Sequence, residues 1–204
     1  MRLRPVLLAP ATLLLGLACQ PRPAAPVAAP VYGAWEEGHT LTFEDPSLPQ
    51  PQRANERIQV RVTQSAIAPG SPRLVQLDLT SAQGRKTLIL KHQDGGITLL
   101  GEDARVLATL LPVHFPETPA WVDHGTEFRV IGRAKWEGAA LLPATSDPIG
   151  VWVEASSPQG PRRRTLYLPN LGEVEAQVDR AGAWVTVHRL VAQGFTDLPM
   201  TKRP

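Results

Sequence analysis

Cysteine is nearly absent from this chain of 204 residues, in which Cys19 is the only one. Without a second thiol the chain cannot form an intrachain disulfide, so packing alone must stabilise the fold. Nor does any apolar run reach the roughly 20 residues that a membrane-spanning helix needs. The sequence therefore predicts neither a disulfide scaffold nor a transmembrane helix.

Motifs that carry catalytic or metal chemistry are also lacking. None of the histidines stands in H-x-x-x-H or H-E-x-x-H spacing, and there is no G-x-S-x-G, S-x-x-K or glycine-rich phosphate loop. We therefore predict no catalytic residue, metal or cofactor. The alternative is an envelope hydrolase whose histidines meet only in the folded chain; these are His39, His92, His114, His124 and His188.

An excess of positive charge is missing from the domain itself. The chain has 21 basic and 19 acidic side chains, and two of the basic ones, Arg2 and Arg4, lie in the first 18 residues. Without these two the charges balance, so we predict no nucleic-acid partner. The basic run 162–164 is interpreted as a solvated hairpin end and a charged edge strand rather than as a site for lipid headgroups.

The N-terminal segment has the plan of an export signal. A basic start is followed by an apolar run that ends in small residues and then in Cys19. This ending resembles the lipobox of bacterial lipoproteins: Ala18 fits it, whereas Gly16 stands where that family prefers Leu. The resemblance implies acylation of Cys19 and anchoring in a membrane. The alternative is ordinary cleavage after Ala18, which leaves an unmodified thiol.

The rest of the chain divides into a tether and a domain. We predict a signal peptide over residues 1–18, the lipidated cysteine and a Pro/Ala-rich tether over 19–32, and a single β domain over 33–204. An extended tether of this kind can lift the domain about 30 Å from the bilayer. Gln20 after the cysteine, by resemblance to lipoproteins, implies the inner leaflet of the outer membrane, facing the periplasm. Residues 44–53, with three prolines, are interpreted as a surface loop.

From residue 57 onward the apolar side chains recur with a period of two, which indicates half-buried antiparallel strands. The fold class predicted is all-β and mainly antiparallel: one large curved sheet, barrel-like or sandwich, with at most one short helix. Residues 102–111 suit a short helix as well as a strand. The candidate strands are 58–62, 75–79, 85–92, 97–100, 105–111, 127–134, 151–155, 164–168, 173–178 and 183–191.

Local turn signals connect these strands. The run 94–96, Asp-Gly-Gly, predicts a hairpin turn, and Gly125 favours a turn at Asp123 and His124 over a catalytic pair. In the last strand, alternation places Trp184, Thr186 and His188 on one face.

Tryptophan is the common large aromatic, with five residues against four Phe and two Tyr. Such side chains anchor the core of a sheet, but they also line apolar cavities. The candidate lining residues of a ligand cavity are Trp121, Trp136, Trp152 and Trp184.

Three blocks of sequence, over residues 33–42, 121–130 and 165–174, together resemble a family of uncharacterised exported bacterial β-proteins. That family opens with a W-x-x-G-x-x-L-T-Y strand, matched here from Trp35 except that Phe43 replaces the Tyr. It closes with a W-Y-A-P-G-V-G-x-V block, of which this chain keeps Tyr167, Pro169 and Gly172. The resemblance implies an architecture similar to the curved-sheet carriers of the periplasm, which hold acyl chains on a concave face.

The function predicted is that of a membrane-anchored envelope lipoprotein, a non-catalytic binding or structural module for an apolar ligand or lipid. Its partners would be the membrane, through N-terminal acyl chains, and a lipid or an envelope protein. Besides the hydrolase, a second alternative is a subunit of an envelope assembly that docks its partner through an exposed edge strand.

Overall fold

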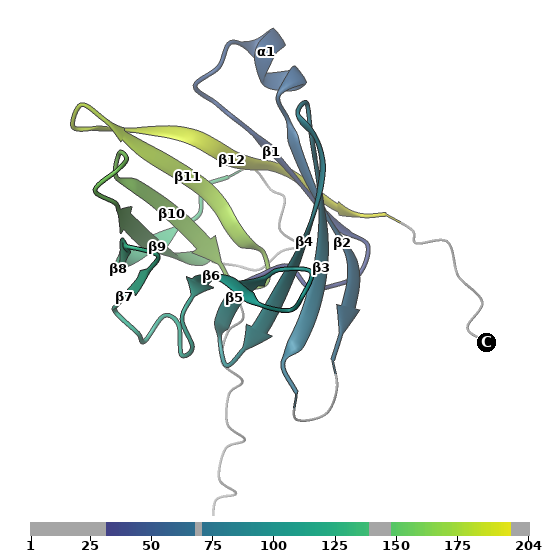
Figure 1. Ribbon diagram of the computed structural model, residues 1–204. Coiled ribbons are helices and arrows are strands. Elements are labelled where there is room, and N and C mark those ends of the chain that lie inside the picture. Colours follow the sequence, from purple (N-terminus) through teal and green to yellow (C-terminus); the bar gives the residue numbers. More distant parts are fainter. Residues whose placement is uncertain (1–31, 68–70, 139–147, 197–204) are drawn as a thin grey trace, which may run out of the picture.

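The computed structural model describes residues 32–67, 71–138 and 148–196. In these residues one antiparallel sheet of 12 strands curls into a nearly closed barrel, accompanied by a single short helix (Figure 1). The predicted all-β fold class is confirmed. The signal peptide, Cys19 and the tether up to residue 31 lie outside the described residues.

The chain runs up and down around the barrel. The first half contains β1 (His39–Glu44), α1 (Gln50–Asn55), β2 (Ile58–Ala66), β3 (Arg73–Ser81), β4 (Gly84–Gln93), β5 (Gly96–Leu100) and β6 (Val106–Leu111). The second half contains β7 (Ala120–Asp123), β8 (Thr126–Lys135), β9 (Ile149–Ser156), β10 (Arg163–Leu168), β11 (Gly172–Arg180) and β12 (Ala183–Phe195). Neighbours in sequence pair with one another, except that β6 and β7 do not pair and β1 pairs with β12. The barrel is thus closed where β1 pairs with β12 and interrupted between β6 and β7.

Two-residue turns set the register of several hairpins. Both central residues have positive φ in the turns at 94–95, 124–125 and 181–182, the backbone of a type I′ turn. In each of them glycine takes the second position, where a side chain would be strained. The predicted turns at residues 94–96 and at Gly125 are confirmed.

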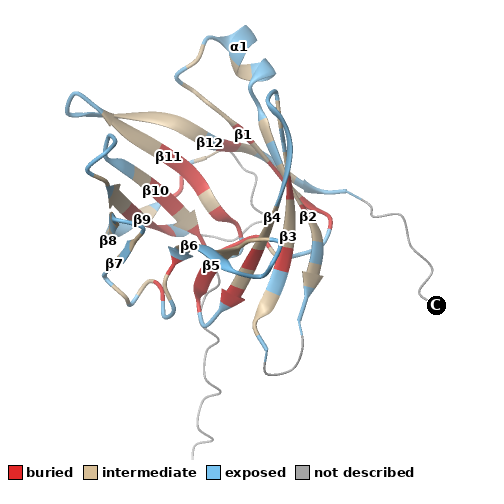
Figure 2. Ribbon diagram, in the orientation of Figure 1, coloured by how far each residue is buried: buried red, intermediate tan, exposed pale blue. Residues whose placement is uncertain are grey.

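The core is closed at one end by the connection between β6 and β7. Phe115, in this connection, is almost completely buried and meets the rings of Tyr32, Trp121 and Tyr167 edge to face, with centroids 4.9 to 6.3 Å apart. The buried residues gather toward the middle of the strands and toward their ends remote from α1 (Figure 2). The core therefore fills one part of the barrel more tightly than the other.

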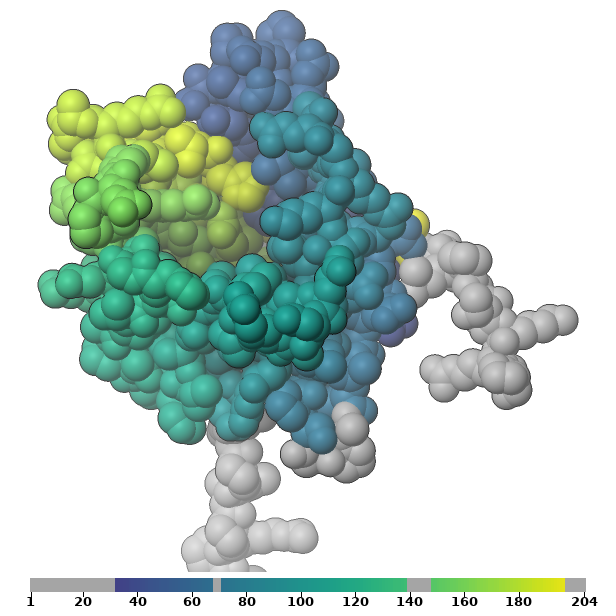
Figure 3. Space-filling view, viewed as in Figure 1, coloured from purple at the N-terminus to yellow at the C-terminus, as the bar shows by residue number. Residues whose placement is uncertain are grey.

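The gap between β6 and β7, which we call the seam, is bridged by side chains. Asp123 Oδ1 accepts a hydrogen bond from Thr109 N at 3.2 Å, and His124 Nε2 donates one to the Leu107 carbonyl at 2.8 Å. These bonds occupy backbone groups of β6 that a strand partner would otherwise use. In the space-filling view the teal segments on the two sides of the seam lie next to each other (Figure 3).

Two local expectations were wrong, and one open alternative is decided. The predicted loop over residues 44–53 leads into α1, where Pro51 is tolerated because the first helical turn needs no N–H donor. Of the two alternatives for residues 102–111, the structure has the strand, over Val106–Leu111. Strand β10 is not an edge strand, because it pairs with both β9 and β11.

The face assignment in the last strand was also wrong. The register pairs Ala176 with His188 but Gln177 with Thr186, so it skips Val187. Neighbouring residues of β11 point to opposite faces, and a bulge of this kind shifts the alternation along β12. Thr186 and His188 therefore lie on opposite faces of the sheet.

Candidate functional site

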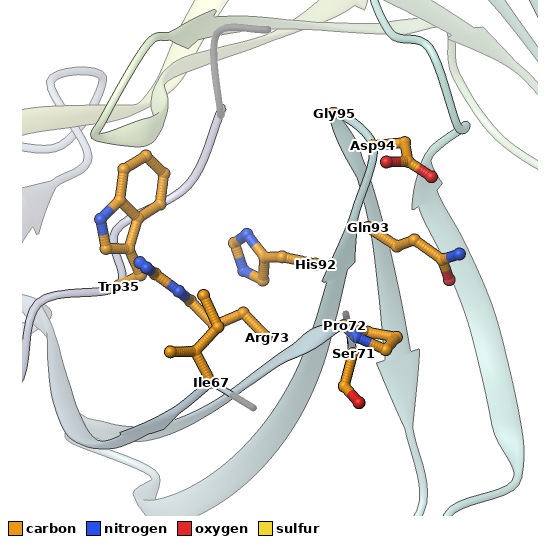
Figure 4. A pocket seen from close by; sticks show the side chains of 9 residues that line it. All are labelled: Trp35, Ile67, Ser71, Pro72, Arg73, His92, Gln93, Asp94 and Gly95. Atoms are coloured by element: carbon orange, nitrogen blue, oxygen red, sulfur yellow. The ribbon is translucent and has the colours of Figure 1, made fainter. Parts of the chain in front are cut away.

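A pocket of about 480 Å³ opens at the end of the barrel where the β2–β3 and β4–β5 connections lie. Arg73 on β3 and His92 on β4 are directly opposite each other in the ladder, and Trp35 comes from the segment before β1. Figure 4 shows these three side chains around the pocket. The lining residues are Trp35, Ile67, Ser71, Pro72, Arg73, His92, Gln93, Asp94 and Gly95.

Three planar groups make up one wall of the pocket. The Arg73 guanidinium carbon lies 5.4 Å from the centre of the Trp35 ring, within the range of a cation–π contact. The Trp35 and His92 rings meet edge to face, with centroids 6.1 Å apart. A cation, an aromatic surface and an imidazole are thus held side by side.

His92 is the unusual member of this group. Its side chain is buried, with 6% of the residue exposed, and among the described residues neither ring nitrogen has a hydrogen-bond partner. Burial, helped by the charge of Arg73, lowers the pKa of His92 to about 4. The imidazole is therefore neutral near pH 7 and holds one N–H donor and one acceptor in reserve.

Glycine at position 33 permits this arrangement. A Cβ atom built on Gly33 would lie 2.5 Å from Cε1 of His92, closer than atoms can approach. The backbone before β1 can therefore pass directly against the edge of the imidazole. Any larger residue at this position would displace the ring and reshape the pocket.

The pocket combines features that ligand sites in proteins share. Its volume falls within the range of ligand sites in proteins, which join apolar walls with a few placed polar groups. Ile67 and Trp35 supply apolar surface, Arg73 supplies positive charge, and Asp94 and Gln93 supply polar groups at the margin. A ligand with an apolar body and a polar or anionic group matches this wall.

The four tryptophans predicted to line a cavity are distributed over the barrel. Trp152 and Trp184 lie near one another, because the guanidinium of Arg164 sits over both rings at 5.0 and 4.6 Å. Trp121 stacks on Phe128 at 5.0 Å and lines a separate cavity of about 470 Å³. Trp136 is buried in the core.

Arg164 is part of a polar chain rather than a freely solvated end. Its Nε donates to Gln177 at 2.7 Å, and Gln177 in turn donates to Glu175 at 2.5 Å. Glu175 also accepts hydrogen bonds from Thr186 and Arg189, both at 3.1 Å. The neighbouring Arg162 pairs with Asp179. The predicted solvated role of run 162–164 is thus wrong for Arg164.

The histidines are dispersed among different partners. Among the described residues, no group of three or more potential ligands is placed to hold a metal ion. One histidine has a carboxylate neighbour: His188 Nδ1 lies 2.9 Å from Glu173 Oε1, while Phe43 packs on its ring. His39 bonds Gln193, His124 bridges the seam, His114 lies in the β6–β7 connection, and His92 lines the pocket.

The comparisons with known proteins found a likeness of fold only. No protein-family model matches the chain, and none of the curated proteins matches it. The structure is similar to that of a Bacteroides fragilis protein, provisionally described as exported and as having a YmcC-like fold. The TM-score is 0.49 at 14% identity, covering 81% of this chain and all of that one. It is also similar to a Parabacteroides distasonis protein provisionally described as a lipoprotein, with a TM-score of 0.48 at 13% identity, covering 81% of this chain and 99% of that one.

In the described residues no helix is long and apolar enough to cross a membrane. Sequence reasoning missed the pocket: it left Trp35 out of the candidate cavity lining and named His92 only among the histidines of the alternative hydrolase. A signal did exist. The turn at residues 82–83 fixes the β3–β4 register, and counting back from it places Arg73 opposite His92.

Proposed function

We propose that this chain is a lipid-anchored protein of the cell envelope that acts as a non-catalytic binding module. Its ligand would occupy the pocket of Trp35, Arg73 and His92 and would have an apolar body with a polar or anionic group. The observation that supports this proposal most directly is His92, whose ring nitrogens are buried without a partner among the described residues. A buried polar group left unpaired costs about 1–3 kcal/mol, so such a group calls for an explanation.

A ligand accounts for His92 if its arrival rearranges the pocket wall. Both ring nitrogens are covered, and the backbone at Gly33 lies against the edge of the imidazole, so the pocket wall would have to shift as the ligand enters. Arg73 would then pair with the anionic group and the neutral imidazole would bond the ligand. Both interactions are short-range and local, and neither needs a catalytic step.

The anchor rests on the N-terminal sequence. The export signal, Cys19 at its end and the Pro/Ala tether support acylation and a position on the inner leaflet of the outer membrane, facing the periplasm. The Cys19→Ala variant should leave the membrane fraction that survives a carbonate wash and appear in the soluble fraction. A carbonate-resistant Cys19→Ala protein would contradict the anchor.

The ligand is tested by native mass spectrometry of the protein purified from the cells that make it. We expect an additional small-molecule mass that disappears in Arg73→Gln and in His92→Phe. Arg163→Gln is the matched control, because Arg163 is a partly exposed arginine on β10, away from the pocket lining. Equal ligand masses in all four proteins, or none in the wild type, would contradict the proposal.

The seam supports a second candidate function, in which a partner protein docks on the barrel. Val106 and Val122, on the two strands beside the seam, are large apolar residues with more than half of their surface exposed. Strands β6 and β7 already hold each other across the seam through Asp123 and His124, so the partner would dock on these exposed apolar side chains rather than add a strand. A photo-reactive amino acid at Val122 should then capture one specific envelope protein in cells, and the same residue at Gly160, in an exposed turn, should not.

A further inference from the structure

A second feature lies directly beside the ligand pocket. Trp35, Ile67, Arg73 and Phe195 share a shallow cavity with Glu36 and Glu37, and we call these four residues the rim. Ile67 is 66% exposed and Phe195 is 63% exposed, although both are large and apolar. Three of the four rim residues, Trp35, Ile67 and Arg73, also line the ligand pocket.

The rim side chains are held in place rather than loosely displayed. The Phe195 ring stacks on the His39 ring with centroids 4.8 Å apart and an angle of 12° between the planes. His39 is itself buried and bonded to Gln193. Trp35 is covered on one face by Arg73. Exposed apolar groups fixed in this way mark a surface that contacts something other than water.

The position of the rim in the chain points to the membrane. Trp35 comes three positions after Tyr32, where the described structure begins, and Tyr32 stands thirteen positions after Cys19. Even a fully extended chain of this length reaches at most about 45 Å. The rim therefore belongs to the part of the domain that the chain from Cys19 joins first.

The charges around the rim indicate which kind of lipid surface it fits. Arg73 contributes one positive charge, and Glu36 and Glu37 contribute carboxylates to the same cavity. Of these, Glu37 accepts a hydrogen bond from Ser65 N at 2.9 Å. A surface without excess positive charge is not attracted to anionic lipids. Trp and Tyr, by contrast, are enriched at the level of the lipid headgroups.

We propose that the rim docks on a zwitterionic lipid surface, so that the ligand pocket opens where the domain meets the bilayer. This contact is additional to the acyl anchor and does not require a ligand in the pocket. The anchor holds the domain near the membrane, and the rim gives the domain one orientation on it. A ligand could then pass between bilayer and pocket without crossing open water.

The experiment uses the whole chain, as processed and purified from the cells that make it, bound to phosphatidylethanolamine–phosphatidylcholine vesicles. Lipids with brominated acyl chains quench the fluorescence of tryptophans that touch the bilayer. We expect quenching in the wild type and in Trp184→Phe, and loss of most of it in Trp35→Phe. Trp184 is the control because it lies under Arg162 and Arg164, among residues that line neither the pocket nor the rim cavity. Full quenching in Trp35→Phe would overturn the proposal.

A second pair of variants guards against a change of fold at Trp35. The double change Ile67→Ser and Phe195→Ser removes two exposed apolar side chains and should also abolish most of the quenching. Val106→Ser with Val122→Ser is the matched control, because these residues are equally apolar and are 52% and 68% exposed at the seam. Wild-type quenching in the Ile67/Phe195 variant, or a several-fold rise on adding phosphatidylglycerol, would overturn the assignment. The ligand proposal is judged separately, by the mass that co-purifies.

Discussion

Asp123, the last residue of β7, accepts a hydrogen bond from the backbone N–H of Thr109 on β6, although the two strands are not paired. A carboxylate here takes the place of a strand carbonyl. Together with the bond from His124 to Leu107, it holds the two halves of the barrel against each other where the ladder is interrupted. Side chains thus bridge the barrel at the seam, where the backbone hydrogen-bond ladder is interrupted.

This arrangement predicts how the seam responds to substitution. Asp123→Ala removes the acceptor, so the amide of Thr109 should exchange its hydrogen faster, by roughly tenfold for about 1.4 kcal/mol of lost protection. Asp123→Asn keeps a side-chain oxygen and should leave the exchange rate close to that of the wild type. Hydrogen exchange followed by NMR measures both. Equal rates in the wild type and in Asp123→Ala would show that the bond does not hold the seam.

Substitution of two glycines with nearly the same φ should separate the effect of backbone strain from the effect of steric crowding. Gly95 and Gly182 have φ of 80° and 87°, but a Cβ on Gly95 would lie 2.9 Å from the Phe115 carbonyl oxygen, while one on Gly182 meets nothing within 4 Å. Gly182→Ala should therefore lower the free energy of unfolding by about 1 kcal/mol through strain alone. Gly95→Ala should lower it by about 1–3 kcal/mol more. Denaturant titration measures the difference, and equal losses would refute the close packing at Gly95.

Phe115 should be the most sensitive position of the β6–β7 connection. It is 1% exposed and touches three other aromatic rings, so Phe115→Ala leaves a cavity in the core. We expect a loss of about 3–5 kcal/mol in the free energy of unfolding. Val122→Ala, at a residue that is 68% exposed, should change it by less than about 0.5 kcal/mol. A small effect at Phe115 would mean that the connection does not close the core.

The burial of His92 should make the folded protein less stable in mild acid. Its pKa is about 4 in the folded state, against 6.5 for the free side chain. Above pH 6.5 the imidazole is neutral in both states; below it the unfolded chain binds a proton that the folded state takes up only near pH 4. The free energy of unfolding should therefore fall between pH 6.5 and 4, by about 3 kcal/mol in total.

The comparison with His92→Phe isolates this effect from other titrating groups. Because phenylalanine does not titrate, the difference between the pH profiles of the two proteins should contain the fall assigned to His92. Asp78, whose pKa is lowered mainly by its hydrogen bond from Arg85, contributes at lower pH and equally in both proteins. Parallel profiles for wild type and His92→Phe between pH 6.5 and 4 would contradict the burial of a neutral imidazole.

Much of the fold could be predicted because its causes are local. Alternating side chains define a half-buried strand wherever they occur, and Asp94–Gly95 and His124–Gly125 adopt turns that few other residue pairs accept. Apart from the short helix α1, the departures came from features that need a partner strand. The bulge at Val187 depends on how β12 fits β11, and the central position of β10 depends on which strands flank it.

The candidate site was less predictable for the same reason. Trp35, Ile67, Arg73 and His92 come from four separate segments, and only one pair of them is related by a hairpin register. The two tryptophans brought together, Trp152 and Trp184, meet through Arg164 on a third strand. No spacing along the chain records such contacts.

The amino-acid sequence by itself determined the strands and most of the turns, because each depends on neighbouring residues or on a period of two. Only the tertiary structure decided that β1 pairs with β12, that β6 and β7 face each other unpaired, and that His92 is buried beside Arg73 and Trp35. Those features arise when strands distant in sequence share one closed surface, and closure is a property of the whole sheet.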